Sequence, residues 1–62
     1  MKYNEVEKRL KKAGCYLVGS MGGHPLWSSP ITGKYFKMSH HGSQEVASGT
    51  LKSISRDSGV KF

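Results

Sequence analysis

The chain of 62 residues allows one domain over residues 1–62 and excludes a deep, enclosed substrate pocket, so any chemistry is expected on an open face. Ten Lys and Arg against four Asp and Glu give a formal charge of +6, which favours a nucleic-acid partner over a merely solvated basic surface. A single cysteine excludes an intramolecular disulfide and zinc sites that need several thiolates, and without a membrane span or signal peptide we expect a cytoplasmic protein.

The first predicted element is an amphipathic helix over residues 4–13. Asn4 is the expected N-cap, and Glu7 follows three residues later, as in a capping box. Gly14 is expected to end the helix in a left-handed conformation. The apolar stripe of this helix consists of Val6, Leu10 and Ala13.

Three short runs of strand-forming residues come next, and turn residues separate them. We expect strands at 15–18, 26–28 and 34–38, paired as an antiparallel meander. Pro25 lacks an N–H, so we place it at the start of its strand or on a sheet edge. The predicted connections are a hairpin turn at 21–23 and a Pro-Gly turn at 29–33.

A second helix is predicted from Ser48 to about Asp57, after a polar loop. Ser48 is its expected N-cap, Leu51 and Ile54 are expected to face inward, and Gly59 is expected to end it. The order α-β-β-β-α predicts an α+β fold of two layers, in which both helices cover one face of the sheet.

The tripeptide Gly22-Gly23-His24 in the predicted hairpin is the candidate site. Histidine titrates near pH ~6.5 and can exchange a proton at cellular pH, while glycines allow a tight turn and close approach of a ligand to the backbone. Attack of a ribose 2′-OH on the adjacent phosphate needs one proton removed and another supplied, and an exposed imidazole suits either transfer. The alternative is an ordinary exposed histidine in a turn.

A single histidine does not easily perform both proton transfers. The candidates for the second transfer are His41, His40, Lys34, Lys37 or a water molecule. His40 and His41 are disfavoured as a metal pair, because adjacent residues of an extended chain point to opposite sides. No carboxylate cluster suited to Mg²⁺ is visible, so we expect neither a metal nor another cofactor.

Four cations are candidates for holding phosphates. Lys34 and Lys37 flank the third predicted strand, and Lys52 and Arg56 lie four residues apart on one face of the last helix. A charged, solvated surface explains them equally well. Trp27, Tyr35 and Phe36 are candidates for stacking on unpaired bases, but core packing is favoured for Trp27. Alternation places Tyr35 and Phe36 on opposite faces of their strand, so one of them is expected to be accessible.

The sequence resembles the HicA (YcfA-like) toxin family of bacterial type II toxin–antitoxin modules over nearly its whole length. Three segments carry the resemblance. They are the first helix closed by Ala13-Gly14 and followed by Tyr16-Leu17-Val18, the turn Gly22-Gly23-His24, and 49–54 with Ser58-Gly59-Val60 behind it.

The resemblance implies a fold like a double-stranded-RNA-binding domain, cleavage of mRNA, and neutralisation by a HicB-type antitoxin. It also implies that His24 is the catalytic residue and that His41 occupies the family's loop position for a second histidine. The leading hypothesis is therefore a metal-independent ribonuclease. The alternative from another class is a non-catalytic module that docks RNA by shape.

Overall fold

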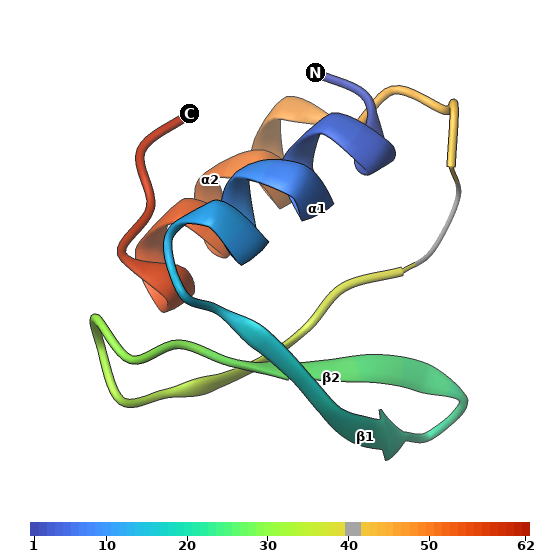
Figure 1. The fold of residues 1–62 in the computed structure, drawn as a ribbon. Coiled ribbons are helices and arrows are strands. Elements are labelled where there is room, and N and C mark those ends of the chain that lie inside the picture. The colour runs from blue at the N-terminus through green and yellow to red at the C-terminus, as the bar shows by residue number, and fades with distance from the viewer. Residues whose placement is uncertain (40–41) are drawn as a thin grey trace.

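The computed structural model describes residues 1–39 and 42–62. The two helices lie side by side over one face of a three-stranded sheet, and no described element covers the other face (Figure 1). This arrangement confirms the predicted order α-β-β-β-α and the α+β class. The elements are α1 (Tyr3–Lys12), β1 (Tyr16–Met21), β2 (His24–Ser28), β3 (Tyr35–Lys37) and α2 (Ser48–Ser58).

The sheet is antiparallel throughout, with β2 in the centre and β1 and β3 at its edges. Trp27 faces Leu17 on one neighbouring strand and Phe36 on the other, so these three side chains share one face. The register of β1 shifts between Leu17 and Gly19, which leaves Val18 as the extra residue of a β-bulge.

The core lies between the sheet and the two helices. Trp27 is 2% exposed, and its ring stacks on Phe36 with the centroids 6.4 Å apart. This confirms that Trp27 is a core residue and that Tyr35 and Phe36 lie on opposite faces, since Tyr35 is exposed. The buried apolar residues are Val6, Leu10, Cys15, Trp27, Phe36, Met38, Val46 and Ile54.

The N-terminus of α1 differs from the prediction. The helix begins at Tyr3, and its cap is Lys2, whose backbone N–H donates to Glu5 Oε1 at 3.3 Å. The prediction that Asn4 caps the helix is wrong, because Asn4 lies in the first turn and its own N–H donates to the carbonyl of Gly42 at 2.9 Å. A distant loop therefore satisfies donors that a local cap was expected to satisfy.

The strands extend further around the hairpin than predicted. Because Met21 pairs with His24, β1 continues to Met21 and β2 begins at His24, so Pro25 lies inside the central strand near its start. Its missing N–H removes a donor on the side that faces β3, but its carbonyl still accepts from the Met38 N–H at 3.1 Å.

The second predicted cap is also wrong. Ser48 is the first residue of α2, and the N-cap is Ala47, which offers no side-chain acceptor. The inward direction of Ile54 is confirmed, since it is buried, and Leu51 packs against the core. At the other end, Gly59 closes α2 with φ +77° and its N–H donates to the Ser55 carbonyl at 2.9 Å, as predicted.

Gly59→Ala should destabilise the fold by about 2 kcal/mol or more, because it combines left-handed strain with overlap. A Cβ at this position would lie 2.6 Å from Ile31 Cγ2. Gly49→Ala is the matched control, since Gly49 is helical and an added Cβ there meets nothing within 4 Å. Urea unfolding should show a much lower midpoint for Gly59→Ala and no lower midpoint for Gly49→Ala. Equal midpoints would contradict this account of Gly59.

Candidate nucleic-acid interface

The Gly22-Gly23 pair forms a two-residue hairpin turn between β1 and β2. The φ angles are +60° at Gly22 and +81° at Gly23, the combination that a type I′ turn requires. An added Cβ at either glycine would meet nothing within 4 Å, so the requirement for glycine is conformational and the space around the turn is open. This turn places His24 at the first position of β2, where the residue is exposed.

His24 belongs to the sheet face that points away from the helices. Trp27 is buried on the helix-covered face, and alternation along β2 therefore directs His24, Leu26 and Ser28 to the uncovered face. Because Lys37 pairs directly with Leu26, it lies on the same face as His24 and is its diagonal neighbour. Diagonal neighbours across strands lie about 7–8 Å apart, which is within reach of a lysine side chain.

Lys34 occupies a different position. It precedes Tyr35, which pairs with Ser28 at the far end of β2 from His24. Its backbone N–H donates to Thr32 Oγ1 at 3.2 Å, which ties it to the turn at 29–33. Of the two predicted cations beside β3, Lys37 therefore occupies the position diagonal to His24, and Lys34 lies at the opposite end of the strand.

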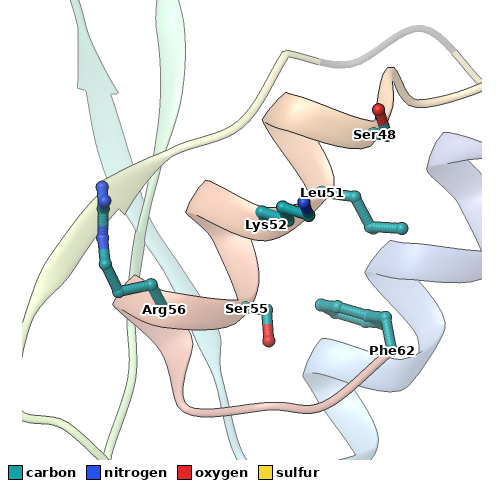
Figure 2. Close-up of a pocket in the computed structure, with 6 residues that line it drawn as sticks. All are labelled: Ser48, Leu51, Lys52, Ser55, Arg56 and Phe62. Atoms are coloured by element: carbon teal, nitrogen blue, oxygen red, sulfur yellow. The ribbon is translucent and has the colours of Figure 1, made fainter.

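Lys52 and Arg56 line one groove between α2 and the C-terminal tail. The groove has a volume of about 430 Å³ and is open to solvent. Figure 2 shows Leu51 and Phe62 both extending into the space between the two helices, while Arg56 extends away from Phe62. The Phe62 ring also lies 5.9 Å from the Arg9 guanidinium. The lining residues are Ser48, Leu51, Lys52, Ser55, Arg56 and Phe62.

This groove and His24 are on opposite sides of the sheet, because α2 lies on the helix-covered face. The helix packs against β3, so that strand is the element between the two groups of residues. The groove itself was not predicted, because Phe62 joins it only through the path of the tail behind Gly59.

The part of the chain that forms the sheet contains basic residues but no acidic ones. No Asp or Glu occurs anywhere between Lys8 and Gln44, a range that contains all three strands. Near the groove, Arg56 Nε forms an ion pair with Asp57 Oδ1 at 3.4 Å, and the Arg56 side chain is 73% exposed. An exposed pair of this kind is weak and leaves Arg56 available to a phosphate.

The candidate second histidine lies outside the described residues. His40 and His41 are the two residues in question, so the role predicted for His41 stays a prediction. Within residues 1–39 and 42–62, no group of three or more His, Cys, Asp or Glu side chains is arranged to hold a metal ion. In the same part of the chain, neither α1 nor α2 has the length and apolar character that a membrane crossing requires.

A family model described as the HicA toxin of bacterial toxin–antitoxin matches residues 3–60, which include every helix and strand of the described fold. The chain belongs to the HicA toxin family. It is therefore the toxin component of a toxin–antitoxin pair, and an antitoxin is its partner. Searches of curated proteins and of solved structures returned no match to this HicA-family chain.

Proposed function

We propose that this HicA-family toxin is a single-domain, metal-independent endoribonuclease that cleaves mRNA in the cytoplasm. The observation that carries the proposal is the exposed His24 at a tight two-residue turn, with Lys37 as its diagonal neighbour. An open face of this kind admits a polymer, and the absence of carboxylates from 8 to 44 favours a polyanion.

In the proposed reaction, the ribose 2′-OH attacks the adjacent phosphorus and the bond to the leaving 5′-oxygen breaks. One group removes the proton of the 2′-OH, another gives a proton to the 5′-oxygen, and the products are a 2′,3′-cyclic phosphate and a 5′-OH. We assign one transfer to His24. The Lys37 ammonium would stabilise the extra negative charge that develops on the phosphate oxygens.

The second proton transfer is assigned to His41 or to a water molecule. Lys34 is not assigned to it, because Tyr35 and Ser28 place that end of β3 away from His24. Lys37 is better suited to charge stabilisation, since its exposed ammonium is a compact positive charge with three hydrogen-bond donors.

Lys52 and Arg56 would hold phosphates further along the strand, with Gly22 and Gly23 leaving space for the backbone near His24. The groove combines these two cations with the Phe62 ring, on which an unpaired base can stack. RNA that occupies both places passes over the β3 edge, because α2 packs against β3 and His24 lies on the opposite face.

The double variant Lys52→Ala/Arg56→Ala should weaken RNA binding and lower its salt dependence. Each lost phosphate contact reduces the slope of log K against log salt by about 0.7 for single-stranded RNA. The matched control, Lys11→Ala/Lys12→Ala, removes the same charge from exposed positions on α1. Fluorescence anisotropy at several salt concentrations measures both slopes. A control that loses as much slope as the groove variant would show that only net charge matters.

A HicB-type antitoxin is proposed to silence the enzyme by covering the His24 face.

The activity itself is tested by incubating the purified toxin with RNA in excess EDTA. Cleavage under these conditions supports the proposal. RNA that is retarded in a gel but remains uncut would instead favour a binding module without catalysis.

A further inference from the structure

The strand β1 has unusual exposure for a run of apolar residues. All six of its residues are exposed, including Tyr16 at 55%, Leu17 at 57%, Val18 at 43% and Met21 at 55%. None of the six carries a charge. Large apolar side chains exposed along one edge strand, on both faces of the sheet, indicate an interaction site.

The two edges of the sheet are protected to different degrees. Short length and lysines commonly protect an exposed edge from pairing with another chain. The edge strand β3 has both, since it spans three residues, ends at Lys37 and follows Lys34. The opposite edge strand is twice as long, lacks lysine and has only the bulge at Val18. It is therefore the edge that remains open to a partner.

The register shows which backbone groups of β1 are available. The Pro25 carbonyl accepts from the Met38 N–H, so the backbone of Pro25 faces away from β1. Ser20 pairs with Pro25 without hydrogen bonds between them, and the N–H and C=O of Ser20 consequently point outward. The same alternation applies to Leu17, which is paired with Trp27.

Three classes of occupant can be compared by charge. A second copy of this chain brings a like charge of +6 to the contact, which opposes association. RNA needs cations at its contacts, and β1 has none. An acidic polypeptide segment matches both the carboxylate-free sheet and the apolar side chains of this edge.

We propose that the antitoxin binds by adding an extended, acidic segment with alternating apolar residues to the β1 edge, as a fourth strand. The partner follows from family membership, and the consequence for inhibition rests on the proposed function. Because Met21 faces His24 across the hairpin, a strand on this edge would end beside Met21, one strand away from His24, and the rest of the antitoxin would restrict access of RNA to His24.

The test is calorimetric titration of the toxin with its cognate antitoxin, in the His24→Gln background and without RNA. Leu17→Lys should weaken binding by about 100-fold, as expected for a central contact. Ser20→Pro removes one outward donor and should weaken binding by about tenfold, whereas Ser20→Ala keeps it and should have no effect. Ile31→Lys is the control for Leu17, since Ile31 is 56% exposed in the turn at 29–33.

Amide hydrogen exchange provides a second measurement, and it needs no variant. Antitoxin binding should slow exchange at Leu17 and Ser20 selectively. Equal affinity of all four variants, each shown to be folded by its thermal melt, would overturn the proposal. Strand variants that lose RNA binding but retain the antitoxin would also overturn it and would assign β1 to RNA. Because binding is measured without catalysis, failure of the nuclease proposal leaves this result unaffected.

Discussion

His24→Ala should lower the rate of RNA cleavage by about 10²–10⁴-fold, the usual contribution of a general acid or base. Growth arrest on expression should disappear with it. The imidazole is exposed and belongs to no described hydrogen bond, so its loss leaves the core and the Gly22-Gly23 turn intact. A quenched single-turnover assay on purified protein gives the rate, and RNA affinity should change little.

Met21→Ala is the matched control for this substitution. Met21 is paired with His24 across the same turn and is 55% exposed, but it has no group that transfers a proton. Its variant should retain cleavage within about threefold, because only apolar surface is removed. If His24→Ala cleaves RNA at the rate of Met21→Ala, the assignment of His24 is wrong.

Trp27→Ala should leave most molecules of the protein unfolded at 37 °C. Removing a buried Trp side chain costs about 3–5 kcal/mol, and a domain of this size is stable by only about 3–9 kcal/mol. Trp27 is 2% exposed, in contact with Phe36 and central in the sheet. Circular dichroism against temperature measures the loss, and the variant should fail to arrest growth because it is unfolded.

Trp27→Phe separates packing from hydrogen bonding at this position. The Nε1 of Trp27 is buried without a hydrogen-bond partner among the described residues, so Phe removes an unsatisfied donor while it fills most of the volume. We expect a change of less than about 1.5 kcal/mol, as for other conservative core substitutions. A Phe variant as unstable as the Ala variant would show that Nε1 has a partner in solution.

Local sequence patterns predicted the helices and strands, but they did not predict which groups form hydrogen bonds at the N-termini of the helices. The burial of Val6 and Leu10 and the αL glycine at 59 depend on residues close in sequence, and both were predicted. Ala13, the third residue of the predicted stripe, is the C-cap of α1 and is exposed. The two N-caps were not, because α1 is completed by the distant loop that contains Gly42 and α2 begins at Ala47 without a side-chain acceptor. The end of β1 at Met21 likewise depends on pairing across the hairpin.

The candidate site also has features that the sequence could predict and features that it could not. Exposure of His24 could be predicted, because glycines at 22 and 23 indicate a tight hairpin. Its proximity to Lys37 and not to Lys34 could not, since it depends on which residue of β3 pairs with Leu26. The groove with Phe62 depends on how the C-terminal tail returns over α2, and no periodic sequence pattern predicts the course of the tail.

The chemical identity of the fragment ends reveals which oxygen attacks the phosphorus. Wild-type toxin is incubated with RNA in EDTA, and the fragments are divided into two portions. Mass spectrometry of the first, untreated portion identifies the phosphate at the 3′ end. Labelling of the second portion with polynucleotide kinase detects 5′-OH ends. We expect 5′-OH ends and 2′,3′-cyclic phosphates, because the 2′-OH is the nucleophile. Fragments with 5′-phosphates, or cleavage that stops when EDTA is added, would contradict a metal-independent reaction at His24.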